Sequence, residues 1–190
     1  MMESDISKFV LRILFPMLGS ILIGLMFLST TIFQISSSAF QFVGFGVFGA
    51  IVLATTKVTS IQKSFVALVL AAFFYELILF PLGTHLIIRD VLFLLGIGSA
   101  IIVFRSYFYK RLNGTIVARP LVLAAMLAIN GIVITYILRF AFSFFFEGIH
   151  EPAAAASANL GFGFLIGLGL GAGDEFAELS KQQWKLLFQA

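Results

Sequence analysis

The stretch PLVLAAMLAINGIVITYILRFAFSFFF, residues 120–146, contains a single charged side chain, Arg139. An α-helix rises 1.5 Å per residue, so about 20 apolar residues cross the ~30 Å hydrocarbon core of a bilayer. This stretch is long enough to cross with a tilt or to project above the membrane. Similar stretches lie on both sides of it, and we predict an all-α, polytopic membrane protein that forms one domain over residues 1–190. The six predicted spans are residues 9–31, 40–56, 64–80, 91–107, 120–146 and 153–172.

The composition supports this class of protein. The chain of 190 residues is 61% hydrophobic and 11% charged, and its mean hydropathy is +1.10. Soluble domains carry about 25% charged residues, because they need a wetted surface. The net charge of +3 comes without a dense basic patch, which favours contact with lipid headgroups and argues against nucleic acid as a partner. The chain has no cysteine, so disulfides and thiolate metal sites are excluded.

The distribution of the twelve Lys and Arg residues predicts the orientation of the spans. In chain order, the segments before, between and after the spans carry two, none, two, one, four, none and two of these cations. Alternate segments therefore hold ten cations against one, which is the asymmetry that the positive-inside rule describes. We expect a protein of the inner membrane with both termini in the cytoplasm.

The last segment, residues 174–190, differs in character from the spans. Asp174 and Glu175 suit the start of a helix, where the helix dipole favours negative charge. Apolar residues that include Trp184 follow at helical spacing, and two lysines lie elsewhere on the wheel. We predict an amphipathic interfacial helix on the cytoplasmic leaflet with Trp184 as its anchor. The alternative is a helix that docks on a partner.

Small residues recur at four-residue spacing within the predicted spans. Gly163, Gly167 and Gly171 form one row in the last span, and Ser20 and Gly24 form another in the first. Small residues allow the backbones of neighbouring helices to approach closely. We therefore predict that these five positions pack helices together. A surface that slides or self-associates is the alternative, and the spacing does not separate the two.

Two charges are predicted to lie inside the membrane. Glu76 and Arg139 each precede the outer end of their span by a few residues, which places both roughly 6–10 Å below the external surface. An ionised side chain in hydrocarbon costs a few kcal/mol or more unless it is paired or hydrated. Their matching depth predicts either a structural ion pair or an outward-facing polar pocket for a small zwitterionic or anionic ligand.

Further polar residues are predicted near the same external side, in the loops and at the ends of the spans. Together with the two membrane charges they define a candidate pocket, for which a structural ion pair with ordinary wet loops is the alternative. The candidate ligand-binding residues are Glu76, Tyr136, Arg139, Glu147, His150 and Asn159.

The sequence offers no catalytic or cofactor motif. His85 and His150 both fall in predicted external loops, and neither HExxH nor GxSxG occurs. The glycines of the last span do not follow a predicted strand, so they do not form a nucleotide-binding loop. We therefore expect no enzymatic activity, no bound metal and no cofactor. A lipid-modifying membrane enzyme is the remaining enzymatic alternative.

The length, the six predicted spans, the internal termini and the external polar cluster resemble the substrate-capture subunit of energy-coupling-factor transporters. In that family a six-helix subunit binds a vitamin or a metal near the outer face, and it docks on a transmembrane coupling subunit through small-residue helix faces. The resemblance implies that Ser20, Gly24 and the glycines of the last span are docking faces. It implies a pocket formed by Glu76, Tyr136, Arg139 and Asn159. The first external loop, residues 32–39, is shorter than the lid of that family.

The stretch from Ala71 through Tyr75 and Glu76 to His85 resembles part of the rod-shape-determining MreD family. There an acidic residue is followed by a Leu-Gly turn and another span, and the resemblance implies a scaffold without substrate turnover. Two functions stay open at this point. One is a solute-binding or transport subunit, and the other is a non-catalytic scaffold or assembly subunit, either of them with a membrane partner or as a homo-oligomer.

Overall fold

The computed structural model describes the backbone of residues 2–30, 35–56, 60–79, 87–112, 117–141 and 152–187. Side chains are described for residues 10–24, 44–56, 60–70, 72, 91–112, 117–137, 140 and 156–179. The described residues form helices and no strand, which confirms the all-α prediction for this part of the chain. The helices are α1 (Met2–Thr30), α2 (Ile35–Thr56), α3 (Ile61–Leu79), α4 (Ile87–Val103), the π-helix η2 (Phe104–Phe108), α5 (Ala118–Ala141) and α6 (Pro152–Leu187).

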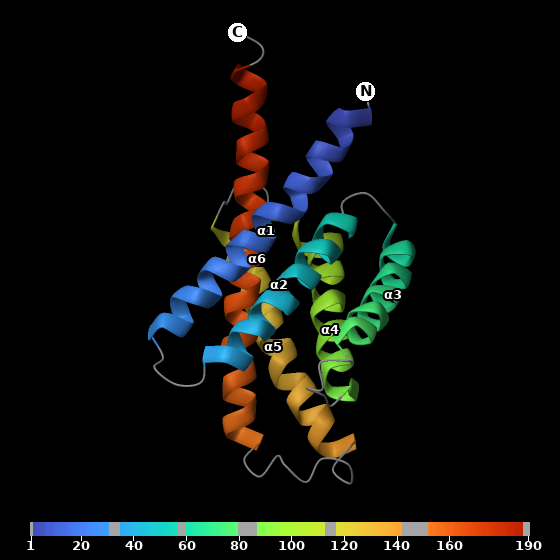
Figure 1. The fold of residues 1–190 in the computed structure, drawn as a ribbon, viewed down its shortest axis with the longest axis vertical. Coiled ribbons are helices and arrows are strands. Elements are labelled where there is room, and N and C mark those ends of the chain that lie inside the picture. The colour runs from blue at the N-terminus through green and yellow to red at the C-terminus, as the bar shows by residue number, and fades with distance from the viewer. Residues whose placement is uncertain are drawn as a thin grey trace.

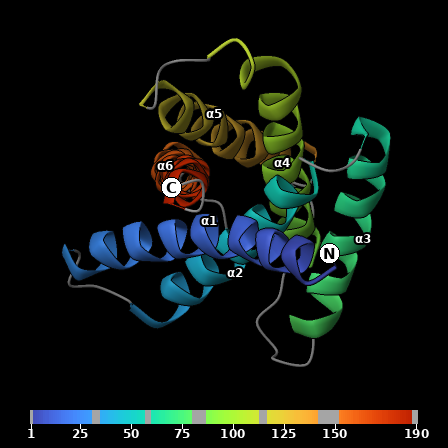
Figure 2. The same cartoon turned by 90° about the horizontal axis from the view of Figure 1, so that it is seen from above.

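The helix α6 runs along the long axis of the molecule and α1 and α2 cross it obliquely (Figure 1). Both chain ends lie at the same end of the molecule, which we call the terminal end (Figure 1). The view from above shows α6 end-on, with α5 on one side and α1 lying across it on the other (Figure 2). The contacts of α6 with α5 are the most extensive between any two helices, followed by those with α1. The helix α3 lies at the periphery, beside α4 (Figure 2). The last helix of the chain, α6, therefore packs between α1 and α5.

The core is one cluster of aliphatic side chains and phenylalanines that α2 to α6 and η2 contribute. Its largest fully buried members include Leu53, Leu68, Leu94, Ile101, Leu123 and Ile166. Many other large apolar side chains point outward, such as Val66 (62% exposed) and Phe140 (77% exposed). An apolar outer surface of this extent is costly in water and suits a lipid environment.

Three helices carry an apolar segment that is long enough to cross a membrane: Val91–Phe108, Ala118–Ile137 and Ala156–Leu179. In the other three, the described apolar segments are shorter, at Val10–Gly24, Gly44–Thr56 and Ile61–Leu70. Each predicted span overlaps one of the six α-helices. Three of these helices are long and apolar enough to cross a membrane. We therefore describe the chain as a helical membrane protein.

The C-terminal segment differs from the prediction. Residues 174–187 do not form a separate helix after a break, because α6 is continuous from Pro152 to Leu187. The acidic pair Asp174 and Glu175 does not start a new helix. Both side chains are buried inside the bundle, where arginines of η2 and α5 pair with them. At 1.5 Å per residue, α6 is about 54 Å long, and its C-terminal end rises above the ends of α2 to α5 (Figure 1).

Candidate functional site

Two ion pairs join η2, α5 and α6 near the terminal end. Arg119 Nη1 donates a hydrogen bond to Glu175 Oε1 at 2.9 Å, and Arg105 Nη1 lies 3.7 Å from Asp174 Oδ2. The side chains are 15% and 9% exposed in the first pair and 9% and 4% exposed in the second. We call these four residues together with Tyr109 the ionic cluster.

Tyr109 connects the two arginines within the ionic cluster. The guanidinium carbons of Arg105 and Arg119 lie 3.6 Å and 4.1 Å from the centroid of its ring. The backbone N–H of Tyr109 donates to the carbonyl oxygen of Phe104 at 2.9 Å, which closes the π turn that also contains Arg105. Turns of this type are rare and frequently occur at functional sites. The π turn therefore sets the positions of two members of the cluster at once.

The ionic cluster balances two positive charges with two negative ones. Burying such groups is expensive, and removing one partner of a buried pair typically costs about 3–5 kcal/mol, because the other charge stays behind. Each arginine comes from a different element, and both acids come from α6. The cluster therefore holds α6 at one register relative to η2 and α5.

The ionic cluster was not predicted from the sequence, in which Asp174 and Glu175 suit the start of a surface helix. A signal was present in the charge pattern. Residues 104–119 contain four cations and no acid, and the acidic pair directly follows the last span on the same predicted side of the membrane. Buried ionisable residues in membrane helices are paired as a rule, so an acidic pair at that depth predicts arginine partners.

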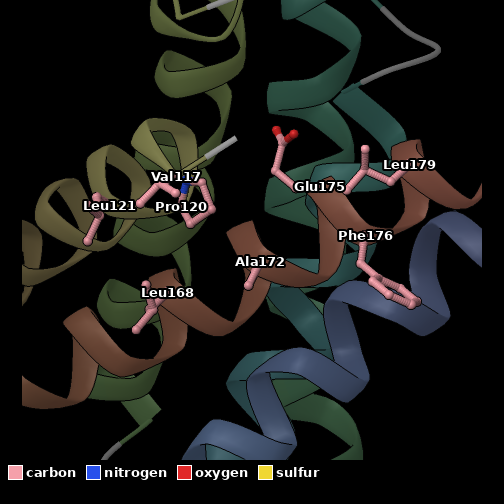
Figure 3. A pocket seen from close by; sticks show the side chains of 8 residues that line it. All are labelled: Val117, Pro120, Leu121, Leu168, Ala172, Glu175, Phe176 and Leu179. Carbon is pink, nitrogen blue, oxygen red and sulfur yellow. The ribbon is translucent and has the colours of Figure 1, made fainter. Parts of the chain in front are cut away.

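A groove of about 360 Å³ lies between the start of α5 and the C-terminal half of α6. Figure 3 shows side chains from the start of α5 on one side and from α6 on the other. The groove is apolar except at Glu175, whose partner Arg119 belongs to the ionic cluster. Its apolar wall includes Val117, Pro120, Leu121, Leu168, Ala172 and Leu179.

The three glycines predicted as a packing row, Gly163, Gly167 and Gly171, face the backbone of α5. A Cβ atom added at Gly167 would lie 2.6 Å from Ala124 Cα, and one added at Gly171 would lie 2.6 Å from Pro120 Cα. A Cβ atom at Gly163 would meet the α5 backbone as well, 2.7 Å from a carbonyl carbon. Because these obstacles are backbone atoms, α5 and α6 can approach this closely only where α6 has no side chain.

A second glycine row of α6, Gly169 and Gly173, faces α1. A Cβ atom at Gly169 would lie 2.7 Å from the backbone nitrogen of Ser20, and one at Gly173 would lie 2.6 Å from Pro16 Cα. Ser20 is 0% exposed, and Gly24, one turn further along α1, is also buried. The row that faces α5 was predicted from the sequence, and the row that faces α1 was not. Two close helix contacts on α6 therefore enclose it from two sides.

Two of the six predicted ligand-binding side chains are described, and they lie in different environments. Asn159 Nδ2 donates to Thr135 Oγ1 at 2.8 Å, and that hydroxyl donates to the carbonyl oxygen of Gly131 at 2.8 Å. Tyr136 is 41% exposed and stacks on Phe140 with ring centroids 6.4 Å apart. The structure thus places Asn159 in the interface of α5 and α6, and Tyr136 on an outward face of α5.

The other four predicted ligand-binding side chains lie outside the described residues. The backbone of Glu76 belongs to α3, which ends at Leu79, and that of Arg139 belongs to α5, which ends at Ala141. Both positions are therefore in the last turn of their helix. Glu147 and His150 fall in a segment that the structure does not describe.

Comparison with protein-family models, with curated proteins and with solved structures finds no match for this chain. The resemblances to transporter subunits and to the MreD family therefore remain predictions from sequence. The distinctive features of the described residues are the ionic cluster, the groove beside it, and the glycine rows that enclose α6.

Proposed function

We propose that this chain is a non-catalytic assembly subunit of the inner membrane, with six spans and both termini in the cytoplasm. In this role it presents the C-terminal end of α6 to a partner protein. The observation that carries the proposal is the continuity of α6, which runs without a break from the apolar segment Ala156–Leu179 to Leu187.

The attachment of α6 to the bundle supports this role. The two glycine rows seat α6 against α5 and α1, and the ionic cluster ties it to η2 and α5 in the C-terminal part of its apolar segment. A helix anchored in this way projects in one direction. An interfacial helix would instead turn to lie along the leaflet with its apolar face in lipid. The geometry therefore favours the partner-docking alternative for the C-terminal segment.

The orientation is proposed from charge and topology together. The ten cations predicted on one side of the membrane lie in four parts of the chain. These are the start of α1, the region where α2 is followed by α3, the region where α4 is followed by α5, and the end of α6. The two chain ends lie at the same end of the fold (Figure 1). Cation-rich loops stay in the cytoplasm, so the terminal end is the cytoplasmic one.

The test of the assembly role is the size of the native particle. The substitutions Trp184→Ala and Leu187→Ala together remove apolar side chains from the end of α6 and keep a good helix former at both positions. In mild detergent extracts of native membranes, we expect the wild-type chain to migrate with a partner and this variant to migrate alone. The matched control is Gln182→Ala with Gln183→Ala, which we expect to migrate like the wild type. A wild-type chain that migrates at its own size contradicts the proposal.

A solute-binding or transport subunit is the second candidate function. Its support is that positions 76 and 139 both lie in the last turn of their helices, α3 and α5, which end away from the terminal end (Figure 1). Thermal unfolding against vitamins, amino acids, metals and lipids tests it, because a ligand at 100 times its Kd stabilises by about 2.7 kcal/mol. We expect any such shift to vanish in Arg139→Ala. No shift in the wild type would argue against a solute-binding role, and the assembly role would be the one candidate left.

A further inference from the structure

We propose that the groove between α5 and α6 binds one acyl chain of an anionic phospholipid of the cytoplasmic leaflet, with the lipid phosphate held by the adjacent cationic segment. The inference depends on the cytoplasmic placement of the terminal end, but not on any partner of α6. The lipid proposal can therefore be wrong while the assembly role is correct, and the assembly role can be wrong while the lipid proposal is correct.

The groove lies at the depth where the headgroup of a lipid joins its acyl chains. Its α5 wall begins where the apolar segment Ala118–Ile137 begins, so it lies at the edge of the hydrocarbon. Its α6 wall runs from Leu168 to Leu179, which corresponds to about 16 Å of helix. Because Glu175 pairs with Arg119 and a Cβ atom at Gly171 would meet Pro120, this wall lies below that edge only from Leu168 to about residue 173, and the rest lies above it. The groove therefore crosses the edge of the hydrocarbon, where it accommodates the glycerol end and the first carbons of a single acyl chain.

The polar end of the groove selects the headgroup. Residues 104–119 carry four cations and no acid. Arg105 and Arg119 belong to the ionic cluster, and Lys110 and Arg111 are exposed on the turn beside Tyr109. Because Arg119 pairs with the one carboxylate that lines the groove, this carboxylate does not confront the phosphate as a bare charge. Each Lys or Arg near the surface attracts anionic lipid, so Lys110 and Arg111 favour an anionic headgroup over a zwitterionic one.

Native mass spectrometry of the full chain in detergent tests both parts of the proposal. The probes are dioleoyl phosphatidylglycerol and dioleoyl phosphatidylcholine, which share their acyl chains and differ in headgroup charge. We expect the wild type to retain one phosphatidylglycerol and to release phosphatidylcholine. The double variant Lys110→Gln with Arg111→Gln should weaken phosphatidylglycerol binding by about fivefold for each cation removed.

The substitution Ala172→Phe tests the groove itself, since Ala172 is an exposed residue of its wall. We expect this variant to lose the retained lipid. The matched control is Ala158→Phe, which makes the same change at an exposed position of α6 fourteen residues from Ala172, and we expect it to bind like the wild type. If Ala172→Phe does not fold, as judged by helical circular dichroism, Leu121→Trp fills the groove from the α5 side.

Two outcomes would overturn the proposal. Equal retention of the two lipids would mean that the headgroup is not selected and that the bound molecules are ordinary annular lipid. Equal lipid binding by Ala172→Phe and Ala158→Phe would place the bound lipid elsewhere on the protein.

Discussion

The contact of Gly167 with α5 is a close helix contact that has a matched control in the same helix. In Gly167→Ala, the added Cβ would lie 2.6 Å from Ala124 Cα and 2.8 Å from the Leu123 carbonyl oxygen, whereas ordinary contact begins at 3.4 Å. Because both obstacles belong to the backbone, α5 and α6 must separate by most of an ångström. Overpacking of this kind typically costs 1–3 kcal/mol. The separation would also loosen the neighbouring contacts of Gly163 and Gly171.

The control is Gly161→Ala, since a Cβ atom at Gly161 would meet nothing within 4 Å. Both variants replace glycine by alanine in the interior of α6, so both gain the same helix propensity, up to about 1 kcal/mol. The difference between them isolates the steric cost, and we expect Gly167→Ala to be less stable than Gly161→Ala by about 1–3 kcal/mol. Reversible unfolding in mixed micelles with increasing SDS, followed by far-UV circular dichroism, measures this difference. Stabilities that agree within about 0.5 kcal/mol would refute the close packing of α6 on α5.

Three further predictions concern the ionic cluster and the contact of α1 with α2. A double-mutant cycle on Arg119→Gln and Glu175→Gln should give a coupling of about 1.5–3 kcal/mol, as expected for a hydrogen bond between charged groups, and additive effects would show that the pair is not formed. Tyr109→Phe should unfold like the wild type because the ring is kept, whereas Tyr109→Leu should lose about 0.5–2 kcal/mol of stability. An equal loss of stability in these two variants would exclude the cation–π contact. Gly46→Ala should be destabilising in the same unfolding assay, since its Cβ would lie 2.7 Å from Ser20 Oγ. Adding Ser20→Gly to this variant should restore much of the lost stability. A double variant that is no more stable than Gly46→Ala would argue against the contact.

The helical class of the protein could be predicted from composition and from the spacing of apolar stretches. A chain with 11% charged residues cannot cover a soluble surface, and stretches such as residues 120–146 are long enough to cross a bilayer. The glycine row of Gly163, Gly167 and Gly171 was likewise visible, because a four-residue period lies on one helix face whatever the neighbour is. These are local properties, and they do not depend on which helix lies beside which.

The partners of each residue were decided by the tertiary structure. A spacing rule does not show that one face of α6 meets α5 and another meets α1, nor that Gly169 and Gly173 form the second row. The acidic pair at residues 174 and 175 is compatible with a helix start by itself. Whether the pair starts a surface helix or is buried depends on whether cations from distant segments contact it. Here Arg105 and Arg119 do. Both acids are therefore buried in ion pairs within the continuous helix α6.

The sequence by itself therefore determined that this chain is a set of apolar helices with small-residue faces and an uneven distribution of cations. Hydrophobic length, small-residue spacing and charge counts are all properties of single segments. Only the tertiary structure decided that α6 is enclosed by α1 and α5, that its acids pair inside the bundle, and that a groove opens beside the pair. Each of these depends on contacts between residues far apart in the chain, and the free energy of such contacts exists only once the helices have packed.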